Sequence, residues 1–469
     1  MRKTKIVATI GPSCMDYDVL KKMVQAGLNI VRINLSHADV KGMDEIYKNV
    51  VRAREELGVP LPIMLDTKGP ELRVKTFVND KVNIKRGQKF IFTGRSVQGD
   101  ETIVSLNMPK LVDAIKVGDR ILAVNGLLTF KVVAKQGKDV ITKAENSGVL
   151  SNRKSLSVPN LVFNTPYLNA ADKADLLWGI EHDCEFVAAS FVNCKQDVLD
   201  LKNFIAKNGG SMKIIAKIES AKGVENLLEI VEISDGLMVA RGDLGVEMNM
   251  EKLPQIQKDM ITLARTMGKP VITATEMLES MIKSKRPTRA EVSDVANAVY
   301  DGTTAVMLSG ETASGDYPVE AVKTMHSIAL ETEQHLNYAD RFDKFDCPLL
   351  NSTDVICHSA VDATFKSATK AVVAFTNSGL AANMVSRFCP AVDIIGATPN
   401  VKTYRQLELT WGVRPMLTPV YNSTDEMFNI ANQLVKQTRL AKVGENIVIT
   451  CGTPKQDGCT NLIKIAQLQ

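Results

Sequence analysis

The sequence predicts an α/β protein built around a (β/α)8 barrel, with a small β domain inserted into it and an open α/β domain after it. Three observations lead to this fold class. Short Val- and Ile-rich segments alternate with helical patterns from the start of the chain, the alternation stops over residues 70–166, and it then resumes as far as a linker at 340–350. Alternating strands and helices are typical of a parallel sheet.

Three barrel strands are expected before the interruption and five after it. The first part contains strands at 5–10, 29–35 and 62–67 and helices at 18–26 and 44–57. The second part contains strands at 186–191, 213–218, 236–241, 270–275 and 305–309 and helices at 169–182, 195–207, 222–232, 251–267, 288–299 and 318–336. Residues 1–69 and 167–340 together make roughly 240 residues, close to the ~250 that such a barrel needs.

The inserted region, residues 70–166, has no long helical pattern. Short alternating segments occupy 73–78, 81–84, 89–93, 102–106, 120–124, 127–134 and 140–144, with turn signals such as Asn125-Gly126 between them. Period-two alternation bounded by turn residues favours a small antiparallel β-barrel. After the linker, residues 346–469 return to alternating helices and strands, which predicts a separate open α/β domain.

Composition excludes several classes of function. The 469 residues carry a formal net charge of +4 and no long basic run, which argues against nucleic-acid binding through phosphate neutralisation. The eight cysteines form no CxxC pair and there are five histidines, so neither a zinc site of usual spacing nor a disulfide framework is expected. No apolar run reaches membrane-spanning length and no signal peptide is visible, so a reducing cytoplasm is the expected location.

Polar and charged side chains gather at the predicted carboxyl ends of six barrel strands, where (β/α)8 enzymes carry their working residues. Lys217 and Glu219 are two residues apart on one strand and therefore point to the same face. A strand-end salt bridge explains any single pair equally well. Six charged strand ends on one rim are harder to explain in that way, because unpaired buried charge is costly and indicates a ligand or a metal.

The residue types on this rim indicate phosphoryl chemistry. Glu219 and Asp243 offer hard oxygen ligands for Mg²⁺ or Mn²⁺. Positive charge suited to phosphate comes from Arg32, Arg73, Lys217 and Arg241. A lysine beside a divalent metal is what phosphoryl transfer requires, since that reaction depends on positioning and charge neutralisation. Oxygen atoms that suit a monovalent cation come from Asn34, Ser36, Asp66 and Thr67. Alternatively, these four side chains only form hydrogen bonds at the strand ends.

Several segments resemble pyruvate kinase in order and spacing, and the resemblance covers the whole chain. The segments that carry it are Lys3–Pro12, Leu65–Arg73, Ile215–Glu219, Ala240–Val246, Ile272–Met277, Arg286–Glu291 and Met307–Glu311. The resemblance is to the short bacterial form, without an extra C-terminal phosphohistidine-type domain. It implies the last step of glycolysis, in which a phosphoryl group passes from phosphoenolpyruvate to ADP and leaves pyruvate and ATP.

The resemblance also implies a role for each residue of the rim. Arg32 would contact the substrate phosphate, and Lys217 would stabilise the phosphoryl group in the transition state. Glu219 and Asp243 would hold Mg²⁺. The substrate carboxylate would lie on the backbone of Gly242 and Asp243 and on the Thr275 hydroxyl, which would also help to deliver a proton to the enolate. The implied K⁺ ligands are Asn34, Ser36, Asp66 and Thr67.

The nucleotide and the remaining partners follow from the same resemblance. The nucleotide phosphates would lie near the stretch from Asn34 to His37, near Arg73 and near Lys154. Glu101 would match a carboxylate that accompanies K⁺ dependence in the family. The inserted domain would act as a lid that excludes water. The family further implies a homotetramer.

The C-terminal domain resembles the family's effector domain. Thr376, Ser378 and Gly379 match the start of a phosphate-binding turn at a helix N-terminus, and an ordinary strand-to-helix turn is the open alternative. Leu380 and Ala381 stand where members that respond to sugar bisphosphates carry hydroxyls, and Asn383 replaces a frequent basic residue. We therefore do not expect activation by fructose 1,6-bisphosphate, and either a different phosphorylated effector or none stays open.

Some positions depart from the family pattern without removing a residue that has an implied role. They are Ala38, Lys222, Glu276, Thr304, Val124-Asn125-Gly126 and Ser157–Asn160. These departures motivate a second hypothesis, a catalytically impaired paralogue that binds phosphometabolites and regulates. A third hypothesis, a class II-type aldolase acting on pyruvate or phosphoenolpyruvate, needs no nucleotide lid and is disfavoured by the insertion.

Overall fold

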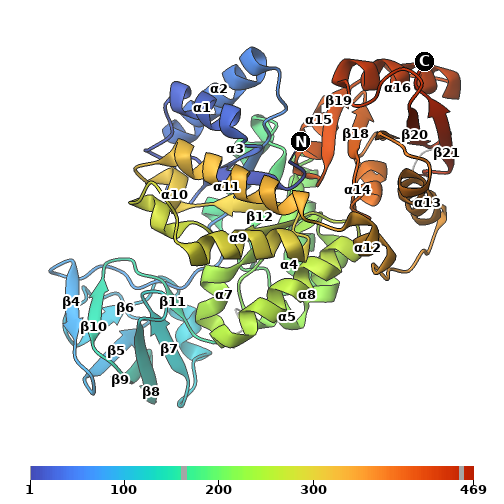
Figure 1. Ribbon diagram of the computed structural model, residues 1–469. Coiled ribbons are helices and arrows are strands. Elements are labelled where there is room, and N and C mark those ends of the chain that lie inside the picture. The colour runs from blue at the N-terminus through green and yellow to red at the C-terminus, as the bar shows by residue number, and fades with distance from the viewer. Residues whose placement is uncertain (1, 160–165, 454–458) are drawn as a thin grey trace.

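The computed structural model describes residues 2–159, 166–453 and 459–469. The barrel occupies the middle of the molecule, the inserted β domain projects from one side, and the C-terminal α/β domain lies on the other (Figure 1). Asn160, which belongs to one of the sequence departures, lies outside the described residues, as do its neighbours up to 165 near the expected end of the insertion.

Eight parallel strands close the barrel in the order β1-β16-β15-β14-β13-β12-β3-β2, which confirms the expected strand count. They are β1 (Lys5–Thr9), β2 (Ile30–Asn34), β3 (Ile63–Asp66), β12 (Phe186–Ala189), β13 (Lys213–Ile218), β14 (Gly236–Ala240), β15 (Val271–Ala274) and β16 (Ala305–Leu308). Nearly every residue of these strands is buried, because helices cover the outer face and side chains fill the interior. The register places Asn34 beside Asp66.

The surrounding helices match most of the expected ranges. They are α1 (Tyr17–Ala26), α2 (Val40–Leu57), α3 (Ala170–Glu181), α4 (Lys195–Lys207), α8 (Leu253–Thr266), α9 (Arg289–Asp301) and α11 (Pro318–Gln334). One short helix, α10 (Gly310–Ala313), matches no expected range. Their ends follow ordinary capping chemistry. At the start of α9, for example, Thr288 and Glu291 form a reciprocal capping box that satisfies two free backbone N–H groups.

Two helical predictions need correction. The helix expected at 222–232 is two helices, α5 (Ala221–Glu225) and α6 (Leu227–Ile233), which meet at Asn226. A short helix that was not expected, α7 (Arg241–Glu247), begins directly where β14 ends. Gly242 and Gly245 conceal this helix because glycine has a low helix propensity. Asp243 in its first turn and the buried Leu244 are the features that favour it.

The inserted domain forms two sheets around one apolar core, where a single antiparallel barrel was expected. Its strands are β4 (Lys81–Ile84), β5 (Lys89–Thr93), β6 (Ile103–Ser105), β7 (Arg120–Ala123), β8 (Leu128–Gln136), β9 (Asp139–Ala144), β10 (Gly148–Ser151) and β11 (Leu156–Ser157). One sheet has the order β11-β7-β8-β9-β5-β6 and the other pairs β10 with β4, while β5 and β6 run parallel. The strand expected at 73–78 is absent because Arg73, Val74 and Phe77 each bridge to a different segment.

The C-terminal domain is an open five-stranded sheet in the order β19-β18-β17-β20-β21, with only β21 antiparallel. Its strands are β17 (Ala371–Phe375), β18 (Asp393–Thr398), β19 (Val413–Leu417), β20 (Asn446–Cys451) and β21 (Leu462–Gln467). Its helices are α13 (Ser352–Lys366), α14 (Leu380–Ser386), α15 (Val401–Gln406) and α16 (Thr424–Thr438). Helix α12 (Tyr338–Asp343) occupies the start of the expected linker. The domain limits expected from the sequence stay predictions.

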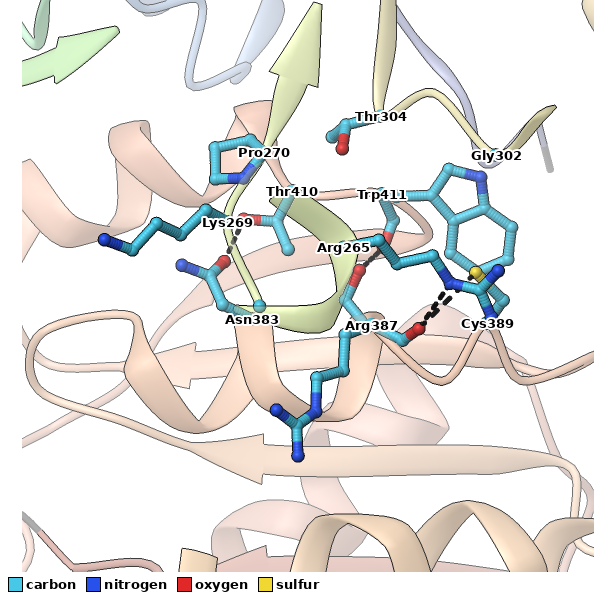
Figure 2. A pocket seen from close by; sticks show the side chains of 12 residues that line it. Arg265, Lys269, Pro270, Gly302, Thr304, Asn383, Arg387, Cys389, Thr410 and Trp411 are labelled. Carbon is cyan, nitrogen blue, oxygen red and sulfur yellow. Dashed lines mark hydrogen bonds between the residues drawn. The ribbon is translucent and has the colours of Figure 1, made fainter. Parts of the chain in front are cut away.

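The C-terminal domain closes the amino end of the barrel. Leu409 from this domain packs inside the barrel with apolar side chains of the strands. Figure 2 shows part of the junction beside a small cavity, where Arg265 of α8 donates to the carbonyl of Arg387 at 2.8 Å and the Thr410 hydroxyl lies 2.7 Å from Asn383. The carboxyl ends of the strands are thereby left as the open end of the barrel. None of the described helices has the length and apolarity needed to cross a membrane.

Candidate functional site

A cleft of about 170 Å³ lies at the carboxyl ends of β2, β3 and β13. The structure brings together in it most of the residues that the sequence singled out. Those lining it are Arg32, Asn34, Ser36, His37, Asp66, Thr67, Arg73, Lys217, Glu219 and Asp243. Four more residues for which no role was expected, Lys68, Glu71, Ser190 and Phe191, complete the lining.

Asp66, at the end of β3, is the buried anion that organises the cleft. One carboxylate oxygen accepts from Arg32 Nε at 2.6 Å and the other from Lys217 Nζ at 2.9 Å. Burial alone would raise the pKa of Asp66, but the two cations outweigh burial and hold that pKa below its usual range. Arg32 is fixed a second time by the Thr9 hydroxyl at 2.6 Å, so its guanidinium has a single orientation.

Lys217 projects from β13 and its ammonium group is surrounded by three oxygen atoms. Asp66 Oδ1 lies at 2.9 Å, Glu219 Oε1 at 3.0 Å and Ser190 Oγ at 2.7 Å. Burial lowers the pKa of a lysine, but Asp66 and Glu219 reverse this and raise the pKa of Lys217 above its ordinary value. The cleft therefore holds a permanent positive charge at a fixed position.

Glu219 lies two residues beyond Lys217 and is only 1% exposed. Its carboxylate accepts from the Phe191 backbone N–H at 2.6 Å and contacts Lys217. Burial raises the pKa of Glu219, Lys217 opposes this shift, and the negative charge of Asp243 adds to it. Asp243 is itself exposed and stands in the first turn of α7.

These two carboxylates form a donor set that fits a divalent cation. Among the residues that the structure describes, no group of three or more His, Cys, Asp or Glu side chains is placed to hold a metal. Mg²⁺ does not need one, since it is usually bound through one or two carboxylates with substrate and water oxygens completing its octahedron. A cation near Glu219 and Asp243 would also relieve their mutual repulsion.

Thr275 follows β15 in a strained turn next to the start of α7. Its hydroxyl accepts from the Gly242 backbone N–H at 2.8 Å, and its φ of +67° lies in the left-handed region that threonine rarely adopts. Arg241 braces this turn by donating to the Thr275 carbonyl at 2.7 Å and pairing with Asp294 at 2.7 Å. Arg241 therefore stabilises the turn. It does not line the cleft, although its position in the sequence suggested that it contacts phosphate there.

The proposed monovalent-cation residues line one wall of the cleft. Asn34 and Asp66 are register partners on β2 and β3, and the backbone N–H of Leu35 donates to the Asp66 carbonyl at 3.1 Å. Ser36 and His37 follow in an exposed turn, where the Ser36 N–H donates to Asn34 Oδ1 at 3.1 Å. All four of these residues line the same cleft.

The residues expected around the nucleotide are only partly brought together. Arg73 lines the cleft, paired with Glu71 at 2.8 Å. Lys154 is exposed and does not line the cleft, although its carbonyl accepts from the Val74 N–H at 3.0 Å. Glu101 lies at the turn between β5 and β6, where its carbonyl accepts from Gln88, outside the cleft. The carboxylate that does enter the cleft from this region is Glu71, whose pKa burial raises.

Ser190 and Phe191 are functional candidates that sequence reasoning missed. They follow β12 at the same rim as the other strand ends. That position is the one sequence feature that could have identified them as site residues. A serine and a phenylalanine carry no charge, so a search for charged strand ends passes over them. Ser190 accepts from Lys217, and the Phe191 N–H donates to Glu219, so both touch the central pair.

The turn expected to bind an effector lies between β17 and α14. The Thr376 hydroxyl accepts from the Gly379 N–H at 2.9 Å, and Gly379 has a φ of +94°. The Ser378 carbonyl accepts from Lys213 Nζ of the barrel at 3.1 Å. Leu380 is 48% exposed, while Asn383 is occupied at the domain junction with Thr410. The turn is therefore ordered by contacts with the chain itself.

Comparison with protein-family models gives two matches in chain order. The model described as pyruvate kinase, barrel domain, matches residues 1–322, and the model described as pyruvate kinase, alpha/beta domain, matches residues 354–466. The chain belongs to the pyruvate kinase family. The resemblance stated from the sequence motifs is confirmed, and so is the fold class of a (β/α)8 barrel with a further α/β domain.

Relatives of the family are similar along nearly the whole chain. A pyruvate kinase of Geobacillus stearothermophilus is 44% identical over 469 residues, which covers 99% of this chain and 80% of that protein. A pyruvate kinase of Clostridium perfringens is 41% identical over 474 residues and is covered in full, as is this chain. The crystal structure of a pyruvate kinase from Cryptosporidium parvum superposes with a TM-score of 0.95 at 33% identity, covering 100% of this chain and 96% of that one.

These comparisons establish the class of activity. The chain has pyruvate kinase function and is a phosphotransferase. Membership of the family implies phosphoenolpyruvate and ADP as substrates and a divalent metal requirement.

Proposed function

We propose that the cleft is the active site and that its residues transfer the phosphoryl group of phosphoenolpyruvate to ADP, in the last step of glycolysis. The observation that carries this proposal is the Lys217 ammonium, buried and held by Asp66, Glu219 and Ser190 at the floor of the cleft. A fixed cation in a site with little water stabilises negative charge much more strongly than a solvated one. The transferring phosphoryl group carries that charge on its equatorial oxygens.

Arg32 and Lys217 would both contact the phosphate of the substrate. Both donate to Asp66, each to a different oxygen of its carboxylate, so Asp66 sets the separation of the two cations. Arg32 has further N–H groups for the substrate phosphate beyond those used on Asp66 and Thr9. During transfer the bond between phosphorus and the enol oxygen breaks as a bond to the ADP phosphate oxygen forms, and Lys217 contacts the phosphoryl group between them.

Glu219 and Asp243 would hold Mg²⁺ or Mn²⁺, and the K⁺ ligands would be Asn34, Ser36, Asp66 and Thr67. A divalent ion bound there supplies positive charge to the substrate carboxylate, the enol oxygen and the phosphoryl oxygens. Two contacts support this assignment: the Phe191 N–H and Lys217 orient the Glu219 carboxylate, and α7 carries Asp243 beside the Thr275 turn.

The substrate carboxylate would lie against the backbone N–H groups of Gly242 and Asp243 and the Thr275 hydroxyl. In the structure that hydroxyl accepts from the Gly242 N–H and donates to the Ala274 carbonyl at 2.6 Å, so both donors would exchange these bonds for bonds to the carboxylate when substrate binds. Once the phosphoryl group has left, the enolate carbon takes up a proton to give pyruvate. Thr275 is the residue placed to relay that proton, through water, to the enolate.

The inserted domain, residues 70–166, would cover the nucleotide as a lid. Arg73, His37 and Asn34 reach the cleft and would contact the ADP phosphates, while Lys154 would join them when the lid moves inward. The lid already contacts the barrel next to the substrate site, since the Ser157 hydroxyl donates to Glu247 at the end of α7. Glu101 would influence K⁺ dependence only through such a lid movement.

Three further proposals rest on the family resemblance. The Thr376, Ser378 and Gly379 turn would bind a phosphorylated effector other than fructose 1,6-bisphosphate, because Leu380 and Ala381 lack the hydroxyl groups and Asn383 is committed to Thr410. The enzyme would work in the cytoplasm. It would assemble as a homotetramer.

The decisive experiment is to measure ATP formation from phosphoenolpyruvate and ADP with Mg²⁺, with and without K⁺. We expect turnover that Mg²⁺ chelation abolishes and K⁺ stimulates. Absence of turnover under every ionic condition would refute the assignment of this cleft and would favour an impaired, regulatory paralogue. Turnover without any response to K⁺ would refute the monovalent site alone.

A further inference from the structure

Ser190 occupies an unusual place in the cleft. Its hydroxyl accepts from Lys217 Nζ at 2.7 Å, and the residue is only 3% exposed. Lys217 has three ammonium hydrogens, and the three oxygens around it belong to Asp66, Glu219 and Ser190. Ser190 therefore supplies the only neutral partner of the ammonium group among the described residues.

The Ser190 hydroxyl is itself held in one orientation. It lies 2.7 Å from the Thr67 carbonyl and 3.2 Å from Asp66, and its single hydrogen goes to the nearer acceptor, the carbonyl. The Ser190 backbone N–H donates to the Thr67 hydroxyl at 3.1 Å, and the Ser190 carbonyl accepts from Tyr167 at 2.7 Å. With its hydrogen committed, the oxygen presents its lone pairs to Lys217.

The two carboxylates and the hydroxyl act on Lys217 in different ways. Asp66 and Glu219 keep the ammonium charged, but charge attraction alone sets its direction only loosely. Lys217 is a flexible side chain with three rotatable donors, so a third directional contact is needed to fix where its charge lies. Misplacing a catalytic charge by about 1 Å can cost around 100-fold in rate.

We propose that Ser190 is a positioning residue that aims the Lys217 ammonium at the transferring phosphoryl group. This inference rests on the assignment of Lys217 to phosphoryl transfer in the proposed function. Ser190 does not bind substrate in this scheme. Its loss leaves the ammonium charged by Asp66 and Glu219 but free to turn, with one N–H left without its protein partner in a largely buried site.

The test is the steady-state kinetics of Ser190→Ala in the full-length enzyme. We expect kcat to fall roughly 10- to 100-fold, the scale of one hydrogen bond to a charged group. The KM for phosphoenolpyruvate should stay close to the wild-type value, because the contact matters in the transition state and not in substrate binding. Ser190→Cys, which keeps the side-chain size but accepts hydrogen bonds weakly, should fall between wild type and Ser190→Ala.

Ser234→Ala is the matched control. Ser234 is 2% exposed and precedes the amino end of β14, whereas the cleft lies at the carboxyl ends of the strands. Among the described residues, the bond of its hydroxyl is to the Val231 carbonyl, at 3.5 Å. We expect its kcat to match wild type. A folded Ser190→Ala enzyme with wild-type kcat, or one in which only KM rises, would overturn the proposal. If wild type itself showed no turnover, the proposed function would fail instead.

Discussion

Strand β13 carries a lysine at each end, half-buried Lys213 and buried Lys217, and the two are in opposite electrostatic situations. At the amino end, burial lowers the pKa of Lys213 and the charge of Asp235 only partly opposes it. Four residues later, at the carboxyl end, Asp66 and Glu219 overcome burial and raise the pKa of Lys217. The same residue type on the same strand is therefore a costly cation at one end and a strongly stabilised one at the other.

The contrast extends to the whole barrel. At the amino end, buried charges are matched by partners from the C-terminal domain. Lys3 pairs with Asp393, Lys5 with Glu408, and Glu185 with Arg405, while Arg54 of the barrel helix α2 also pairs with Glu185. At the carboxyl end the charges border an open cleft. Buried charge alone thus does not identify an active site, because the position of the partners decides whether a ligand can be bound.

The sharpest test of this contrast is to remove the two lysines separately. We expect Lys217→Met to lower kcat by about 1,000-fold or more while phosphoenolpyruvate binding is largely kept, because its charge acts in the transition state. Lys213→Met should leave kcat within about twofold of wild type, since it removes a cation whose burial is unfavourable. Equal losses in both variants, measured by steady-state assay, would erase the distinction between the two ends.

A second pair compares buried glutamates. Glu219→Gln should raise the Mg²⁺ concentration for half-maximal activity by about 100-fold, because a neutral amide replaces a charged ligand. Glu185→Gln should leave that concentration unchanged and instead destabilise the fold by about 3 kcal/mol, since Arg54 and Arg405 lose their shared anion. Metal titration of activity and thermal unfolding of both variants separate the two effects. A stable Glu185→Gln with weakened metal response would contradict this division.

The smallest expected effect comes from two threonines of the β15 segment. Thr275→Val should reduce kcat by about 10-fold, through loss of the hydroxyl at the edge of the site. Thr273 is fully buried and bonds to Thr303 at 2.9 Å, and Thr303 keeps other carbonyl partners if that bond is lost. Thr273→Val should therefore keep wild-type kcat. A larger loss of kcat in Thr273→Val than in Thr275→Val would reverse the comparison.

Much of the fold and part of the site could be predicted from the sequence. Strand ends are marked by a change from apolar to polar residues, which located Asp66, Lys217 and Glu219, and the parallel order of strands brings such ends together. Ser190 escaped because it is small and neutral. Its contact with Lys217 depends on the register of the neighbouring strands β12 and β13, which a local sequence pattern does not predict.

The inserted domain was less predictable for a physical reason. Its backbone is held by non-local pairings, so the path of residues 73–78 and the parallel pairing of β5 with β6 follow from long-range contacts. For this reason sequence likeness alone is the basis for expecting Lys154 near the nucleotide and for linking Glu101 to K⁺ dependence, and the structure puts both outside the cleft. The short helix α7 could not be predicted because it contains two glycines, even though it carries Asp243, one of the expected site residues.

The presence of Leu409 inside the barrel has a consequence for the order of synthesis. A ribosome releases the chain from its amino end, so all eight strands emerge before this leucine exists. Until then the floor of the barrel is an uncapped apolar opening. Newly made barrels are exposed to chaperones and to aggregation over that interval, and a nascent chain arrested before residue 409 should be far more protease-sensitive than the finished protein.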